Sequence, residues 1–199
     1  MRLQNIIYSG TSVLDIMTLA KLPQELKEFL RGQNGVIAFN GGLHIRSCSD
    51  DPAWNSLKEY WTGDKGLFKT YRSLASTDIP FGQDCVGDQF FLRGSDVFRL
   101  SSETGDIENL QVGFGTFLRL ANEDPDEYLM LGPLRQFENN GQSLKPGELL
   151  SVFPLFCMEE SKNGISVRNI PTEERIDFLK EIYGQIKGLP EGKINIRFE

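Results

Sequence analysis

Short apolar runs and turn-forming residues alternate between positions 77 and 120 of this chain. The runs QFFLR and VFRL are separated by three turn-forming residues, Gly94 to Asp96. Glycine reaches the positive φ values of tight turns, and Asp or Ser side chains bond to the turn backbone. The pattern therefore predicts a β-hairpin over residues 89–100. Residues 78–82, which contain a proline and a glycine, are predicted to form a turn that opens this region.

Apolar residues recur at helical spacing in several other stretches. These are residues 22–30, 54–61, 114–121, 126–131 and 172–186. Asp51 is predicted to cap the second helix, because the following Pro52 lacks an N–H and is tolerated at a first helical position. Thr172 is predicted to cap the last helix, and Gly188 stands where a helix C-terminus favours glycine. The two tryptophans share a helical face and are interpreted as packing residues.

Strand-like patterns occupy much of the remaining chain. They cover residues 43–46, 107–112, 148–156 and 193–198, while residues 36–39 fit either a strand or a loop. Pro154 indicates that the third of these strands lies at an edge or ends there. Residues 132–147 hold two prolines and three glycines and are predicted to form a loop. No internal repeat, low-complexity tract or long linker divides the 199 residues, so a single domain over residues 1–199 is expected.

The charge balance narrows the classes of partner. The chain has 28 acidic and 21 basic residues and a formal charge of −7, which argues against direct binding to nucleic acid and permits a basic partner. The same charge also serves solubility alone. Three separated cysteines, Cys48, Cys85 and Cys157, show no Cys-x-x-Cys spacing and indicate a reducing compartment. No signal peptide or membrane span is apparent, so we expect a cytoplasmic protein.

Motifs for catalysis are sparse. Asp78, Asp84 and Asp88 lie close in sequence and constitute an alternative hypothesis, a carboxylate-dependent metal hydrolase. Their spacing matches no EF-hand loop, and the chain has no Gly-Lys-Ser/Thr phosphate loop. His44 is the only histidine, so a catalytic pair with a cysteine would depend on a coincidence of the fold. We therefore expect no enzymatic activity, no cofactor and no bound metal.

Several short motifs occur in an order that resembles the SUKH superfamily. They are Leu22-Pro23, Phe29-Leu30, Asn34-Gly35, the segments DIPFGQD (78–84) and GDQFF (87–91), VFRL (97–100) and FGTFL (114–118). The likeness covers about residues 20–130. It implies an α+β fold with a mostly antiparallel sheet flanked by helices, and no enzymatic activity. Residues 131–199 match no motif of this kind and are expected to form an extension, including a C-terminal helix and strand, packed on the core.

The resemblance also implies a function. Most bacterial members of this superfamily resemble immunity proteins, which neutralise a secreted polymorphic toxin in the cytoplasm, and many such toxins act on nucleic acids. A toxin that binds nucleic acid tends to be basic, which suits an acidic inhibitor. The partner-binding residues expected here are Asp84, Asp88, Asp96, Glu103 and Asp106, although an Asp in a turn often bonds only to its own backbone. The yeast members suggest the alternative of a regulator or scaffold in cell-wall glucan synthesis.

Overall fold

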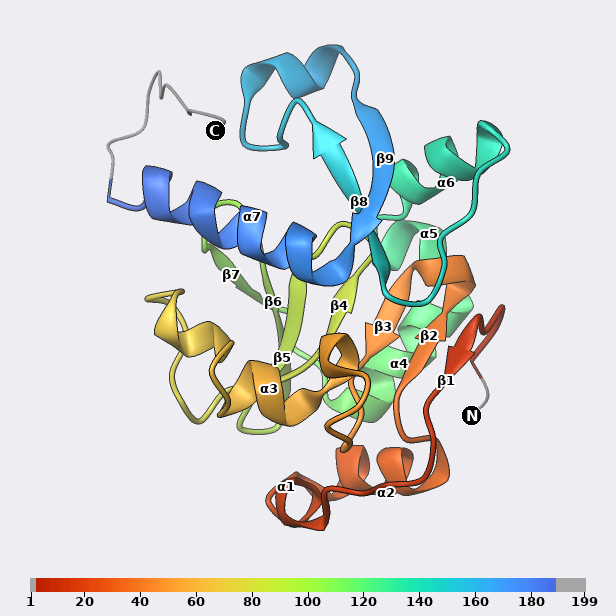
Figure 1. The fold of residues 1–199 in the computed structure, drawn as a ribbon, viewed down its shortest axis with the longest axis vertical. Coiled ribbons are helices and arrows are strands. Elements are labelled where there is room, and N and C mark those ends of the chain that lie inside the picture. Colours follow the sequence, from red (N-terminus) through yellow and green to blue (C-terminus); the bar gives the residue numbers. More distant parts are fainter. Residues whose placement is uncertain (1–2, 189–199) are drawn as a thin grey trace.

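The computed structural model describes residues 3–188 and is built around a seven-stranded sheet (Figure 1). Each strand pairs in antiparallel fashion with the strand before it, so the order in the sheet follows the order in the chain. The strands are β1 (Tyr8–Ser9), β2 (Val36–Ala38), β3 (Leu43–Ile45), β4 (Ile79–Asp84), β5 (Gln89–Arg93), β6 (Asp96–Leu100) and β7 (Ile107–Asn109). The predicted α+β class with a mostly antiparallel sheet is therefore confirmed.

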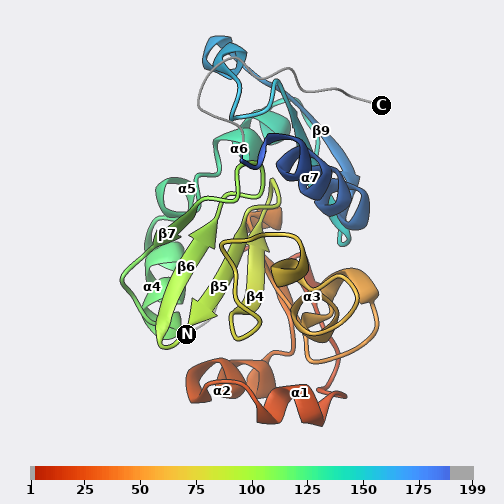
Figure 2. The ribbon, with the colours of Figure 1, turned by 90° about the vertical axis from the view of Figure 1, so that its left-hand side faces the viewer.

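Helices cover both faces of this sheet (Figure 2). They are α1 (Ile16–Ala20), α2 (Gln24–Gly32), α3 (Leu57–Trp61), α4 (Phe114–Glu123), α5 (Pro125–Tyr128), α6 (Gly132–Asn139) and α7 (Thr172–Ile186). Short 3₁₀ helices occur at η1 (Phe39–Gly41), η2 (Ala53–Asn55), η3 (Leu67–Lys69) and η4 (Glu159–Asn163). A second, two-stranded sheet pairs β8 (Glu148–Phe153) with β9 (Ser166–Pro171). None of the helices within residues 3–188 is long and apolar enough to cross a membrane.

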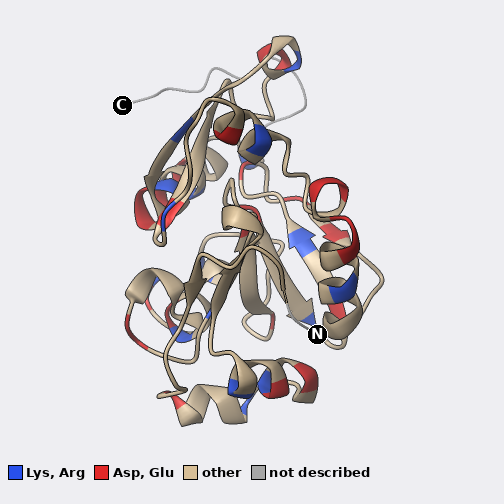
Figure 3. Cartoon of the chain, turned by 90° about the vertical axis from the view of Figure 1, so that its right-hand side faces the viewer, with Lys and Arg blue, Asp and Glu red and all other residues tan. Residues whose placement is uncertain are grey.

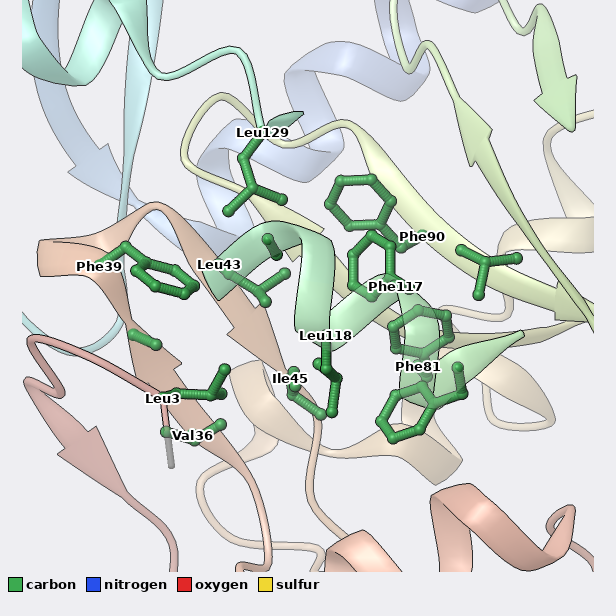
Figure 4. Close-up of a cluster of buried hydrophobic side chains, with 14 of the residues drawn as sticks. Leu3, Val36, Phe39, Leu43, Ile45, Phe81, Phe90, Phe117, Leu118 and Leu129 are labelled. Atoms are coloured by element: carbon green, nitrogen blue, oxygen red, sulfur yellow. The ribbon is translucent and has the colours of Figure 1, made fainter. Parts of the chain in front are cut away.

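Consecutive aromatic residues on β5 supply two separate cores. Phe90 packs in a cluster shared with α2, α4 and α6, where its ring centroid lies 4.9 Å from that of Phe117 (Figure 4). Phe91 packs in a second cluster on the opposite face, together with Ile176 and Tyr183 of α7. Side chains of a strand alternate between its two faces, which explains the division. Each buried Phe contributes roughly 2–3 kcal/mol through the apolar surface removed from water.

The segment after α6 connects these two clusters. On β8, Leu149 belongs to the cluster containing α7, whereas Leu150 belongs to the cluster containing α4. The Leu150 N–H also donates to the Cys85 carbonyl at 2.8 Å, just after β4. The C-terminal part of the described chain thus contributes to the packing on both faces of the large sheet.

Several local predictions are confirmed. The hairpin over residues 89–100 is the β5–β6 pair, and Phe91 lies directly opposite Phe98. The helices predicted from residues 22, 114 and 172 correspond to α2, α4 and α7. Gly188 follows the last helix with φ of +79°, as expected of a C-terminal glycine. The stretch 36–39, left open between strand and loop, contains β2.

Four local predictions are wrong, and a fifth lies outside the described residues. Residues 78–82 are largely the start of β4 rather than a turn, and residues 132–147 begin with helix α6 rather than a loop. Asp51 caps no helix, since α3 begins later and its N-cap is Ser56, which accepts from the Glu59 N–H. Thr172 is already inside α7, and its hydroxyl has no hydrogen-bond partner among residues 3–188. The predicted strand 193–198 lies outside the described residues.

Candidate acidic binding groove

A groove lies where the sheet ends beside α5 and α6. Its volume is about 940 Å³, and its walls come from the β4–β5 loop, β6, the β6–β7 loop, β7, the α5–α6 segment and the loop after β8. Seven lining residues are acidic and two are arginines. The acidic residues are Asp88, Glu103, Asp106, Glu108, Asp124, Asp126 and Glu127. Figure 3 shows acidic positions gathered on α5 and on the neighbouring edge of the sheet.

Three of the five predicted partner-binding residues line this groove. Asp88 and Glu103 come from the two loops at the end of the sheet, and Asp106 stands on its exposed rim before β7. Asp96 begins β6, at the opposite end of that strand from the groove-lining Ser101. The structure therefore brings Asp88, Glu103 and Asp106 together and places Asp96 elsewhere.

Asp84 lies beneath the groove rather than in its wall. Only 1% of its side chain is exposed, and its Oδ1 accepts the N–H groups of Val86, Gly87 and Asp88, each at 3.0 Å. Its Oδ2 accepts from Arg99 Nη2 at 2.8 Å. Because the carboxylate is occupied and buried, Asp84 shapes the loop that presents Asp88 and offers no surface of its own to a partner.

Asp84, Asp88 and Arg99 form one charged cluster. Arg99 Nη2 also lies 3.4 Å from Asp88 Oδ2, so a single guanidinium faces two carboxylates. Burial raises the pKa of Asp84 to about 7, with the neighbouring Asp88 adding to the effect and Arg99 opposing it. Burial likewise raises the pKa of Asp88. One arginine thus only partly offsets the buried Asp84 beneath the groove and the half-buried Asp88 in its wall.

Glu103 is a buried acid with spare acceptor capacity. It is only 4% exposed although it lines the groove. One carboxylate oxygen, Oε2, accepts the Cys157 N–H at 2.9 Å. The other, Oε1, accepts no hydrogen bond from residues 3–188, and its nearest cation is Arg175 Nη2 at 4.0 Å. Arg175 Nη1 is likewise buried without an acceptor among residues 3–188, so the two opposite charges face each other across this contact.

Both arginines of the groove are already paired with acids. Arg99 faces Asp84 and Asp88, and Arg135 bonds to Asp126 and, at 2.6 Å, to Glu138. Four of the lining acids have no ion-pair partner among residues 3–188. They are Asp106, Glu108, Asp124 and Glu127. The negative charge of the groove therefore remains available to a cationic ligand.

Apolar side chains stand exposed among these carboxylates. Met130 is 63% exposed, Phe156 47% and Ile107 36%, and all three line the groove. Apolar side chains surrounded by charged ones are typical of surfaces that bind another protein. These residues and the acids of α5 are not among the partner-binding residues predicted from the sequence. The acidic run from Glu123 to Glu127 was visible in the sequence, but nothing there indicated that it faces the β6–β7 loop.

The three acids of the hydrolase hypothesis do not converge. Asp78 precedes β4 and bonds to Arg93 at 3.0 and 2.8 Å, whereas Asp84 ends the same strand, roughly 20 Å away for six residues of extended chain. Within residues 3–188 no group of three His, Cys, Asp or Glu side chains is arranged to hold a metal ion. His44 is buried on β3, where its Nε2 lies 3.1 Å from the Gly41 carbonyl.

Comparison with known proteins adds no assignment, since neither the protein-family models nor the curated proteins contain a match to this chain. The structure shows an α+β protein with an acidic groove at one end of its large sheet. The resemblance to the SUKH superfamily stays a prediction.

Proposed function

We propose that this protein is a non-enzymatic, immunity-type binding protein that neutralises a basic secreted toxin through the acidic groove. The observation that carries the proposal is the charge of this surface, where seven acids face two arginines that are already paired. The toxin would be a nuclease or another enzyme that acts on nucleic acid, because such a domain presents the positive charge that this groove complements. The resemblance to SUKH immunity proteins points to the same class.

The groove also has the composition of a protein interface rather than of a small-ion site. Met130, Phe156 and Ile107 provide apolar contact area, and the acids around them provide orientation and fast association. Its lining residues come from six separate segments around a volume of about 940 Å³. The three cysteines are free thiols, which fits the proposed cytoplasmic location.

The test is binding and inhibition of the toxin domain encoded beside this gene, using the full chain and the purified toxin domain. Reversing exposed charges with Asp106→Lys, Glu108→Lys and Glu127→Lys should lower the association rate at least about tenfold at low salt and relieve inhibition. The matched control is Asp64→Lys, which changes an exposed acid in the α3–η3 connection outside the groove.

Two outcomes would contradict the proposal. One is a toxin that binds equally well to the wild type and to the triple groove variant. The other is a genomic neighbourhood without a toxin gene, together with no inhibition of any basic nuclease domain tested. The latter would favour the regulatory or scaffolding alternative.

A further inference from the structure

The edge of the large sheet lies in the wall of the groove. β7 is the last of the seven strands, it pairs only with β6, and its three residues are all exposed. Ile107 and Glu108 of this strand line the groove. An edge strand carries backbone N–H and C=O groups that can pair with an additional strand.

The outward-facing backbone groups of β7 can be assigned from its pairing. Ser101 N–H donates to the Asp106 carbonyl and Leu110 N–H donates to the Val97 carbonyl, so positions 106 and 110 face β6. Glu108 is in phase with both, because orientation repeats every second residue in an antiparallel ladder. Ile107 and Asn109 therefore direct their N–H and C=O groups away from β6. No backbone hydrogen bond to these groups from other segments is present within residues 3–188.

Side-chain direction connects this edge to the acids. Glu108 lies directly opposite Arg99 on β6, and both side chains line the groove. A strand added beside β7 would send every second side chain to the same face as Glu108. Those side chains would meet Glu108 and the acids of α5, which are Asp126 and Glu127.

We infer that the groove binds an extended, cationic segment of the partner, which adds to the sheet as a strand beside β7 and places its Arg or Lys side chains among the groove acids. This inference rests on the proposed cationic partner and specifies how it is held. Backbone pairing supplies affinity and the alternate side chains supply selectivity, as in other cases of strand addition.

Glu103 adds negative charge to the wall that the added segment would meet. Its buried Oε1 lies 4.0 Å from Arg175 Nη2, and its Oε2 accepts the Cys157 N–H. A guanidinium or ammonium group of the added segment would be attracted to this acid through space. The exposed ring of Phe156, next to the Cys157 N–H that binds Glu103, is positioned to contact the aliphatic part of such a side chain.

Charge also decides against a second copy of this chain as the occupant. Antiparallel pairing of two β7 strands would bring the acids at positions 106 and 108 of both copies together, with the acids of both α5 helices nearby. Like charges opposite one another destabilise a strand pair. Acids on an edge strand thus discourage self-association while they attract a basic segment.

The test uses a seven-residue peptide of alternating arginine and valine, acetylated and amidated, titrated into the ¹⁵N-labelled full chain. We expect saturable shifts of the backbone amides of residues 106–109, and slower hydrogen exchange at Ile107 and Asn109. A peptide with the same side chains but N-methylated at alternate backbone positions should bind at least about tenfold more weakly, because it cannot form the ladder. Replacing arginine with glutamate in the peptide should abolish binding.

Variants separate the contribution of charge from that of the backbone. The pair Glu108→Gln and Glu127→Gln should weaken binding of the arginine peptide about tenfold or more, whereas the control Asp64→Asn should leave it unchanged. Equal binding of the N-methylated peptide, shifts that map away from residues 106–109, or no saturation at millimolar peptide would overturn the inference. If the toxin domain still binds and responds to Glu108→Lys while Ile107 and Asn109 stay unprotected, strand addition fails and the proposed function stands.

Discussion

His44 and Asp84 are buried ionisable residues whose pKa values move in opposite senses. Burial lowers the pKa of His44 to about 4, aided by Arg46 and opposed by its bond to Gly41. Burial raises the pKa of Asp84 to about 7. The folded state holds this carboxyl protonated to a higher pH than the unfolded chain does. The free energy of unfolding therefore falls as the pH rises towards the folded-state pKa. An imidazole with a lowered pKa stays neutral in the folded state while it becomes protonated in the unfolded chain. The free energy of unfolding therefore falls as the pH falls below about 6.5. Between pH 4 and 7 the two effects oppose each other.

Single substitutions should therefore reveal opposite pH dependences. Asp84→Asn keeps an oxygen for the three loop amides and removes the ionisation, so its stability relative to wild type should rise from pH 4 to 7. His44→Gln keeps a donor for the Gly41 carbonyl, and its relative stability should fall over the same range. Each difference should be on the order of 3 kcal/mol across the window. Urea unfolding at several pH values measures both, and stability curves parallel to wild type would contradict the assignment.

Arg46 is a buried cation held only by neutral oxygens. Its guanidinium lies 4.4 Å from the ring centroid of Tyr60, and no Asp or Glu among residues 3–188 forms an ion pair with it. The acceptors are the carbonyls of Pro80 and Gly82 and the side-chain oxygens of Gln83 and Gln89, at 2.6 to 3.3 Å. Burial accordingly lowers the pKa of Arg46 to about 10. This side chain joins three strands at one point.

Removing this guanidinium should be among the most damaging single changes in the chain. Arg46→Met removes a charged donor from four buried oxygens, of which Gln83 Oε1 keeps a bond from Gln89 Nε2 at 3.3 Å. It should lower the free energy of unfolding by about 3–5 kcal/mol. Arg46→Lys should lower the free energy of unfolding by less than Arg46→Met, because an ammonium group on a shorter side chain reaches fewer of the oxygens. Arg168→Met on exposed β9 is the matched control and should change stability by less than about 0.5 kcal/mol. Urea unfolding distinguishes these cases, and a near-neutral Arg46→Met would disprove the structural role.

At the scale of elements, the mistaken predictions for residues 78–82 and 132–147 have physical reasons that the sequence does not display. Pro80 is tolerated inside β4 because the pairing with β5 shifts register between Ile79 and Gly82, so no ladder N–H is required of it. Gly82 permits a close approach to β3, since an added Cβ would lie 2.6 Å from the His44 carbonyl oxygen. Both residues resemble turn formers in sequence, and only the neighbouring strands explain them.

The predicted loop over residues 132–147 contains helix α6 for a different reason. Gly132 and Pro133 stand in its first turn, where proline is well tolerated, and the remaining breakers lie beyond Asn139. Leu134 and Phe137 retain the helical spacing that buries them. The prolines and glycines of residues 132–147 are compatible with a short helix at the beginning of the segment. Their positions predict that helix, whereas their number favours a loop.

The contact between the β4–β5 loop and α7 can be tested at one glycine. Gly87 has φ of +99°, and a Cβ added there would lie 2.8 Å from Leu179 Cδ1 of α7. Gly141 has φ of +74° with no atom within 4 Å of such a Cβ. Gly141→Ala should cost about 1 kcal/mol of backbone strain alone, and Gly87→Ala should cost more, about 2–3 kcal/mol. Thermal unfolding of the two variants gives the comparison, and equal losses would mean that α7 does not press on this loop.

For the whole molecule, the sequence was sufficient for the fold class and insufficient for the groove. Hairpin and helix patterns over residues 89–121 are local, so they could be read directly. The groove depends on contacts between distant segments, such as the bond from Cys157 N–H to Glu103 across 54 positions. Three of the predicted acids line the groove because the loops that contain them lie at the same end of the sheet. Asp84 accepts three hydrogen bonds from the backbone of its own loop. The sequence alone does not reveal these bonds, so it does not distinguish this buried acid from the exposed acids nearby.

The same long-range contacts predict that the motif-bearing region does not fold without the chain that follows it. Ending the chain at Leu131 removes Leu149 and Leu150, which are fully buried in the two separate clusters, and Ile176 of α7. It also removes Arg175, whose Nε donates to the Val86 carbonyl at 2.9 Å beneath the groove. Losing packing on both faces of the sheet should exceed a marginal stability of about 5–15 kcal/mol. Residues 1–131 should therefore show no cooperative urea transition and weak near-ultraviolet circular dichroism. A chain ending at Gly188 is the control and should unfold cooperatively, whereas a cooperative transition of the shorter fragment would show that both clusters form without β8 and α7.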